Sequence, residues 1–309
     1  MQNPEGKQSK LPIYAALAAN MAIAIVKFIA SRVSGSSAML SESIHSAVDC
    51  ANSLLLLKGI QRSKRPADSK HPFGHGKEMY YYALLVSIMV FTLGGGMSIY
   101  EGITHLQHPE PLANPLINYI VLGFAIFFES ISLTLAIRKF LEVKGQYGFW
   151  KELNLSKDPS LFAIIYEDMA AVAGLLIALV GVFLSHYFQT TFYDGIASIC
   201  IGALLCTVAG IMLWETRSLL VGESANTEIV DGIFQEVKAD PDVRHLQMPL
   251  TMQMAPHEIL VALNVEFKQH LKSGELATVI RRLEHNIRKR YPEVCNIFIE
   301  ARNIVNVTS

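Results

Sequence analysis

Six long apolar stretches constrain this chain more than any other feature of its sequence. A helix that crosses the hydrocarbon core of a bilayer needs about 20 mainly apolar residues. Six windows meet this requirement: Leu11–Ala30, Ala38–Ile60, Tyr80–Ile103, Leu116–Ile137, Leu161–Leu184 and Ile196–Leu213. Only 17% of the 309 residues are charged, whereas an average soluble domain carries roughly 25%. The sequence therefore predicts an all-α membrane bundle of six helices over residues 11–221.

Basic residues are concentrated in two of the connections between these windows. Eleven Lys and Arg residues fall between positions 58 and 77 or between 138 and 157, and Arg32 is the exception at the end of the first window. Lys and Arg in short loops mark the cytoplasmic side of a membrane protein. Both termini, including the tail 1–10, are therefore predicted to be cytoplasmic.

Partners and location follow from similar observations. A net charge of −1 favours no nucleic-acid partner, so the expected surroundings are the lipid bilayer and water. The short polar N-terminus contains no apparent signal peptide or presequence. This favours the inner (plasma) membrane of a bacterium over an organelle.

Residues 222–309 have the composition of a soluble domain. A helical repeat of apolar residues is followed by a strand expected over Val243–Met254 and by the alternating run EILVALNVEF. A second helix is expected from Ser273, and VCNIFIEA reads as a last strand. The order helix, strand, strand, helix, strand predicts a small cytoplasmic α+β domain.

Ionisable residues occur inside the apolar windows. His45 and Asp49 are four residues apart in the second window, which places them on one helical face, and Asp168 lies in the fifth window. Such groups cost several kcal/mol at mid-bilayer unless paired or solvated, and so they are functional candidates. One imidazole with carboxylates suits a small divalent cation, zinc first, with iron, cobalt, nickel or manganese as alternatives. The competing interpretation is a set of buried hydrogen-bonded pairs that hold helices together.

A second cluster lies in the loop that follows the second window. Asp68, His71 and His75 occur within eight residues, and Pro72 and Gly74 bend the chain between them. These three side chains could close around one metal ion. The alternative is a solvated loop whose histidines cap the next helix.

Taken together, these motifs identify a family resemblance. The HxxxD pattern at positions 45–49, the loop HPFGHGK at 71–77, the six apolar windows and the α+β tail resemble the cation diffusion facilitator family of divalent-metal exporters. The amino-acid sequence of several segments, such as YEDMAAVAG, is most similar to the branch of mitochondrial zinc transporters. The resemblance covers nearly the whole chain.

The resemblance implies a function and a site. It implies a homodimeric zinc/proton antiporter, not an enzyme, whose metal is a transported substrate and not a cofactor. The tail would have a ferredoxin-like fold that dimerises. The implied metal ligands are His45, Asp49 and Asp168 in the transport site and Asp68, His71 and His75 in the loop.

Two departures from the family pattern affect this expectation. The family's second HxxxD motif would place a histidine at Ile164, so the fourth transport ligand must be Glu167, Glu129 or a water molecule. A site with one nitrogen is less zinc-specific, and an exporter of Fe²⁺, Co²⁺ or Mn²⁺ is the alternative. In the tail, the family's regulatory ligands are replaced by Asn264, Glu300 and Arg302. The tail is therefore expected to dimerise without a binuclear metal site.

Other classes of protein remain as alternatives. A membrane-embedded metalloenzyme would typically carry HExxH, which is absent from the sequence. A metal sensor or partner subunit would place metal binding in the tail alone. Transport by antiport requires that protons and metal compete for the same ligands, and histidine, with an ordinary pKa of about 6.5, suits that exchange.

Overall fold

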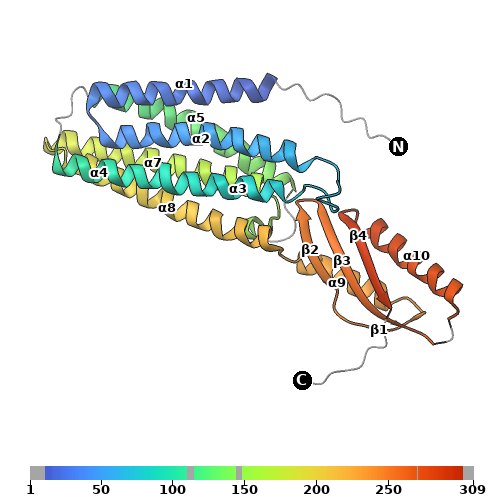
Figure 1. Cartoon of the computed structure of the whole chain (residues 1–309). Helices are drawn as coiled ribbons and strands as arrows, with labels where there is room; N and C mark the ends of the chain where they lie inside the picture. Colours follow the sequence, from blue (N-terminus) through green and yellow to red (C-terminus); the bar gives the residue numbers. More distant parts are fainter. Residues whose placement is uncertain (1–10, 110–114, 144–147, 270, 302–309) are drawn as a thin grey trace. The chain divides into compact units, whose positions relative to one another are not determined.

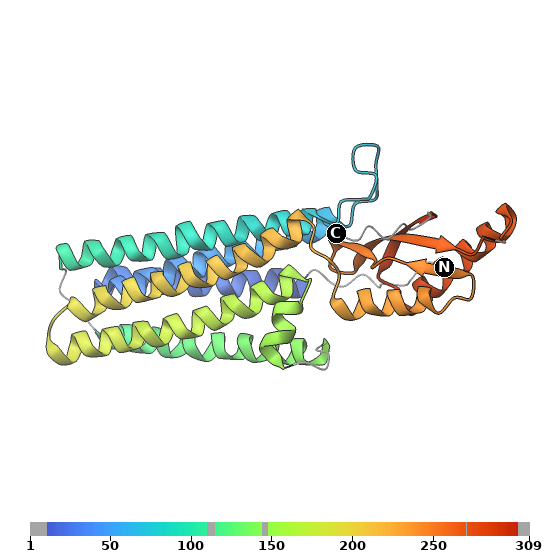
Figure 2. The ribbon, with the colours of Figure 1, turned by 90° about the horizontal axis from the view of Figure 1, so that it is seen from below.

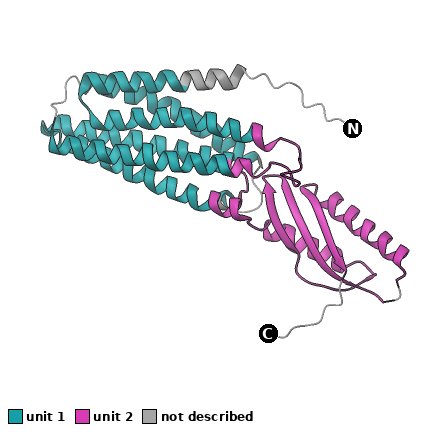
Figure 3. Cartoon of the chain, viewed as in Figure 1, with its two compact units in different colours: residues 1–60, 81–154, 160–215 teal, residues 61–80, 155–159, 216–309 magenta. Residues whose placement is uncertain are grey.

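The computed structural model describes residues 11–109, 115–143, 148–269 and 271–301. The predicted N-terminal tail 1–10 and Arg302 lie outside these residues. The chain divides into two compact units, each considered separately below (Figure 3). The first contains the described parts of 1–60, 81–154 and 160–215; the second contains those of 61–80, 155–159 and 216–309.

The first unit is built from long helices, and a helix covers each of the six predicted windows. The elements are α1 (Leu11–Ser34), α2 (Ser37–Ser63), α3 (Glu78–Met89), the π-helical turn η1 (Val90–Gly96), α4 (Met97–Gln107), α5 (Pro115–Val143), α6 (Phe149–Leu155), α7 (Pro159–Phe188) and α8 (Phe192–Val221). The long helices lie side by side in both views (Figures 1 and 2).

Within the described residues, four helical segments are long and apolar enough to cross a membrane. They are Glu78–Gln107, which joins α3, η1 and α4, and then Pro115–Glu142, Pro159–Phe188 and Phe192–Val221. Large apolar side chains such as Phe124 and Trp214 are exposed on them, as expected of surfaces that face lipid. The helical transmembrane region is therefore confirmed, whereas the count of six spanning helices stays a prediction.

Helix α2 differs from these four segments because it is rich in polar side chains. Ser41, Glu42 and His45 are all buried inside the helical unit. Apolar contacts hold the surrounding helices together, since Met39 of α2, Leu122 of α5 and Leu175 of α7 belong to one buried cluster. The polar face of α2 therefore points into the unit, where an ion can be bound out of contact with lipid.

The tail forms a sheet with two helices. Its elements are α9 (Thr227–Lys238), β1 (Val243–Leu246), β2 (Leu250–Ala255), β3 (Glu258–Phe267), α10 (Ser273–Arg290) and β4 (Val294–Ala301). Strands β1 and β2 both pair antiparallel with β3, and β4 pairs parallel with it. The single strand expected over Val243–Met254 is thus two strands. Pro249 lies in the break, where a residue without an N–H cannot donate to the ladder.

One face of the sheet carries the core of the tail. The predicted alternation along β3 is confirmed, because Ile259, Val261, Leu263 and Val265 are buried. They share one apolar cluster with residues of both α9 and α10, so both helices cover the same face. On the other face, Leu250 and Phe298 flank Ala262 in adjacent strands and are 64% and 52% exposed.

A buried carboxylate joins α10 to the turn before β1. Asp240 accepts hydrogen bonds from Nε and Nη2 of Arg282 at 2.8 and 2.7 Å, and from the N–H of Asp242 at 3.0 Å. Burial raises the pKa of Asp240, but these hydrogen bonds outweigh burial and hold the pKa below its ordinary value. The ionised carboxylate therefore stabilises the folded tail.

We predict that Arg282→Ala lowers the stability of the tail by about 1–3 kcal/mol, because it leaves a buried carboxylate without its main partner. Because the pKa of Asp240 is depressed, its contribution is complete above the unfolded value of about 3.9 and is lost as the pH falls through the folded value. Amide hydrogen exchange of α10 at neutral and acidic pH measures both effects. Arg281→Ala is the control, and equal exchange in the two variants would contradict the prediction.

Candidate metal centres and family membership

The first candidate centre lies on the buried face of α2. His45 Nε2 and Asp49 Oδ2 are 3.5 Å apart, and their side chains are 2% and 22% exposed. The atoms His45 Nδ1, His45 Nε2 and Asp49 Oδ1 are buried without a hydrogen-bond partner among the described residues. Buried polar atoms are rarely left unpaired. These atoms are therefore available as ligands to a cation.

Helices α5 and α7 bring further acidic groups to this region. Asp168 Oδ2 on α7 accepts a hydrogen bond of 2.9 Å from Ser132 Oγ on α5. Glu129 lies one turn before Ser132, and it interacts electrostatically with both Asp49 and Asp168. The charges of Asp49 and Asp168 also interact with each other. Three helices thus direct carboxylates towards one part of the unit.

The alternatives for a fourth ligand have different surroundings. Glu167 is 8% exposed and its Oε1 accepts a hydrogen bond of 2.9 Å from Asn52 on α2. It therefore joins α7 to α2, as expected of a residue that serves a neighbouring helix. Ile164, one turn before Asp168, is 44% exposed and offers no ligand atom. Glu129 is half-buried.

A fully buried ion pair lies beside the first centre and joins α1 to α2. Lys27 Nζ on α1 is 3.3 Å from Glu42 Oε2 and 2.8 Å from Ser46 Oγ on α2. Glu42 lies three residues before His45, so the spacing SESIH was a signal that it shares the polar side of α2. The pair neutralises an ammonium group that would otherwise be buried alone.

The second candidate centre is the loop cluster. One ligand atom from each of Asp68, His71 and His75 lies within 4.8 Å of the other two, and no other such group occurs in the described part of the chain. The ligand atoms of His45, Asp49 and Asp168 therefore lie farther apart than those of the loop cluster. The carboxylate oxygens of Asp68 are 3.2 Å from His71 Nδ1 and 3.1 Å from His75 Nε2. The three side chains predicted from the loop sequence do converge.

Backbone hydrogen bonds keep the loop carboxylate ionised. Asp68 Oδ1 accepts from the backbone N–H groups of His71 at 2.7 Å and Lys70 at 2.8 Å. The N–H of His71 and then the side chain of His75 lower the pKa of Asp68 to about 2. A carboxylate that is charged at neutral pH is ready to bind a cation.

The loop belongs to the same compact unit as the tail, and its glycines have a local purpose. Gly74 has a φ of 88°, a backbone conformation that residues other than glycine rarely adopt. A Cβ on Gly76 would lie 2.7 Å from both the Cβ of Ala255 and the backbone oxygen of Met254, so only glycine lets the loop approach β2. Phe73 contacts Phe298 edge-to-face at 6.2 Å between ring centroids. The motif is therefore fixed against the sheet.

The helical unit and the two clusters together define a class of protein. Buried carboxylates and an imidazole inside a membrane region, with a loop that gathers one carboxylate and two imidazoles, are the features of a membrane protein that handles a small cation. The family model of the cation efflux transmembrane domain matches residues 13–221. The chain belongs to the cation efflux family, and this confirms the predicted resemblance. Because the family consists of transporters, the prediction that the chain is not an enzyme agrees with it.

Three relatives illustrate the range of this similarity. The chain is 30% identical to the mitochondrial proton-coupled zinc antiporter SLC30A9 of Mus musculus, over 89% of this chain and 55% of that protein. Metal tolerance protein C4 of Arabidopsis thaliana is 30% identical over 78% of this chain and 53% of its own length. The cation-efflux pump FieF of Cronobacter sakazakii is 26% identical over 90% of this chain and 88% of its own length. The chain thus spans about half the length of the first two relatives.

We predict that the loop cluster binds one zinc ion and that His75→Ala weakens this binding by at least about tenfold, the loss typical of a disturbed metal site. Zinc titration calorimetry in detergent measures the affinity, in a chain whose transport site is removed by Asp49→Ala and Asp168→Ala. His257→Ala, which removes an exposed histidine of the tail, is the control. Equal zinc affinity in the His75 and His257 variants would refute a metal site in this loop.

Proposed function

We propose that this chain exports a divalent cation, with Zn²⁺ as the first candidate, from the cytoplasm in exchange for protons. The metal is bound by His45 and Asp49 of α2 and Asp168 of α7. The observation that carries the proposal is the pair of ligand side chains on α2, buried among helices, with nitrogen and oxygen atoms that have no hydrogen-bond partner in the described part of the chain. The Mus musculus relative is named a proton-coupled zinc antiporter, and this similarity supports the same activity.

The exchange follows from the chemistry of the ligands. An imidazole nitrogen or a carboxylate oxygen must lose its proton before it binds metal, so metal binding releases protons and protonation releases metal. A site open to a near-neutral cytoplasm therefore loads metal, and the same site open to a more acidic side exchanges it for protons. Alternating access between the two sides is driven by movement of the helices.

The coordination shell makes the choice of metal a separate question. We propose Glu129 as the fourth ligand, with a water molecule as the alternative, because Glu167 is already engaged by Asn52. The Glu129 carboxylate interacts electrostatically with the carboxylates of both Asp49 and Asp168. One nitrogen with three oxygens also suits Fe²⁺, Co²⁺ or Mn²⁺, and a transporter of one of these is the second candidate.

The membrane arrangement completes the proposal. Residues 11–221 form six spanning helices, with both termini and the basic loops on the cytoplasmic side of an inner (plasma) membrane. Residues 222–309 form a ferredoxin-like cytoplasmic domain. Helix α2 spans the membrane although it is polar, because its polar groups face other helices and not lipid.

We further propose a homodimer that forms through the face of the tail sheet opposite α9 and α10, where Phe73 of the loop contacts only part of the surface at Phe298. Leu250, Ala262 and Phe298 form an apolar row there, and the two helices of the tail cover the opposite face. Exposed apolar rows of this kind favour association with a second copy. The double variant Leu250→Lys, Phe298→Glu is expected to shift the purified chain from dimer to monomer in light scattering with detergent mass subtracted. A monomeric wild-type chain would exclude this interface.

We predict that Asp49→Asn or Asp168→Asn abolishes zinc uptake into proteoliposomes driven by a pH gradient, since each removes a charged ligand. The wild-type chain should take up zinc, and collapse of the gradient should stop uptake. His245→Ala, in the tail, is the matched control and should transport normally. Uptake at the wild-type rate by the Asp49 variant would refute the proposed site. Metal binding without any flux would instead favour a sensor.

We predict that Ile164→His raises the preference for zinc over manganese by at least about tenfold, because it adds a second nitrogen ligand one turn before Asp168. Competition uptake with both metals measures this ratio. Ile164→Asn, which adds a polar group but a poor ligand, is the control. An unchanged metal preference in the histidine variant would show that position 164 does not face the bound metal.

A further inference from the structure

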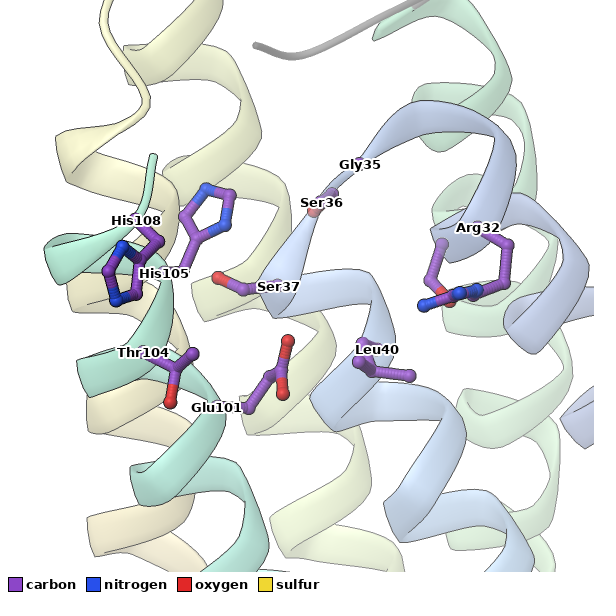
Figure 4. A pocket seen from close by; sticks show the side chains of 10 residues that line it. Arg32, Gly35, Ser36, Ser37, Leu40, Glu101, Thr104, His105 and His108 are labelled. Atoms are coloured by element: carbon purple, nitrogen blue, oxygen red, sulfur yellow. The ribbon is translucent and has the colours of Figure 1, made fainter. Parts of the chain in front are cut away.

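A cavity lies at the end of the helical unit where α1 turns into α2. Its volume is about 250 Å³, and its lining comes from the end of α1, the start of α2 and the last turns of α4 (Figure 4). Ser37 at the start of α2 is one of the lining residues and precedes His45 by eight positions, or about 12 Å of helix. The cavity is therefore separate from both candidate metal centres, and the loop cluster follows the opposite end of α2.

Three side chains with metal-binding atoms come from one face of α4 and its end. Glu101 and His105 are four residues apart, which places them on one side of the helix, and His108 directly follows Gln107, the last residue of α4. All three line the cavity, Glu101 half-buried and His108 exposed at its mouth. Figure 4 shows Glu101 and His105 on the side of α4 that faces α2. This spacing alone would not define a site.

His105 is buried and has an unpaired ring nitrogen, and this observation points to a ligand. Its side chain is 6% exposed, and Nε2 is buried without a hydrogen-bond partner among the described residues. The carboxylate oxygen Asp194 Oδ2 is 3.7 Å from His105 Nε2, which is too long for a hydrogen bond. An imidazole nitrogen that is buried and unpaired beside a cavity is available to a ligand in that cavity.

Asp194 does not account for His105, because its oxygens are already occupied. Oδ1 accepts from Ser36 Oγ at 2.6 Å, and Oδ2 accepts from the N–H and the Oγ of Ser37 at 2.6 and 2.9 Å. The carboxylate thus caps the start of α2 without help from the imidazole. His105 is not needed for that cap.

The charges around the cavity favour a cation over an anion. Arg32 contributes one positive charge from the α1 side, where Figure 4 shows it across the cavity from α4. Glu101 contributes one negative charge from α4, and Asp194, which is bonded to the lining residues Ser36 and Ser37, contributes another. The acidic groups thus outnumber the arginine, and imidazole with carboxylate is a ligand set for zinc-like divalent ions.

We propose that this cavity is a second divalent-cation site in the helical unit, with His105 Nε2 and the Glu101 carboxylate as its anchoring ligands, His108 at the mouth and water in the remaining positions. These ligand atoms are not gathered within 4.8 Å of one another as the loop cluster is, so the affinity is lower than at the loop. A weak site suits a cation that is leaving the protein. That exit role rests on the proposed export function, whereas the binding itself does not.

The test is zinc binding by equilibrium dialysis to the full chain in detergent. The background variant lacks the two other centres through Asp49→Ala, Asp168→Ala, His71→Ala and His75→Ala. It should retain one weakly bound zinc equivalent. Adding His105→Ala or Glu101→Gln should weaken that equivalent by at least about tenfold, and adding His186→Ala, which removes a histidine outside the cavity, should leave it unchanged.

His105→Gln separates ligand loss from misfolding, because glutamine keeps a polar side chain of similar size. It should lose zinc as His105→Ala does, with an unchanged size-exclusion profile. The proposal is overturned if the background variant binds no zinc, or if His105→Gln binds zinc as the background does. A failure of wild-type transport would refute the proposed function and leave this binding result untouched.

Discussion

A charge buried inside a membrane-spanning bundle must be neutralised or solvated, and this constraint organises the helical unit. Lys27 is paired with a glutamate, Asp194 accepts hydrogen bonds from serines at the start of α2, and Asp168 accepts a hydroxyl hydrogen bond. His45 Nδ1, His45 Nε2 and Asp49 Oδ1 have no hydrogen-bond partner among the described residues, and a few other buried atoms, such as Glu42 Oε1 and His105 Nε2, share this state. His45 and Asp49 lie on one helical face, so one cation, or the protons that compete with it in the proposed exchange, would satisfy both.

The same constraint explains why polar residues are concentrated on α2. A helix that displayed Ser41, Glu42 and His45 to lipid would be unstable in a membrane. Apolar neighbours on α5 and α7 enclose that helix instead. Function and packing thus impose the same requirement, since the enclosure that removes the polar face from lipid also buries His45, the imidazole of the proposed cation site.

Periodic features were predictable from sequence, whereas pairings between helices were not. The apolar windows, the alternation along β3 and the convergence of Asp68 with two histidines follow from local spacing. The partner of Lys27 did not follow, because two residues fifteen positions apart meet only through the packing of α1 on α2. The break between β1 and β2 had a local signal in Pro249. The unpaired nitrogen of His105 had no local signal in the sequence, because it depends on the hydrogen bonds that Asp194 accepts from Ser36 and Ser37.

The central claim is that one set of buried ligands exchanges a metal ion for protons. The most direct measurement is zinc titration calorimetry in buffers of different ionisation enthalpy, on a chain whose loop cluster is removed by His71→Ala and His75→Ala. The account predicts that zinc binding releases protons near neutral pH and that Asp49→Asn reduces the number released. Zinc binding without proton release, or release unaffected by Asp49→Asn, would contradict it.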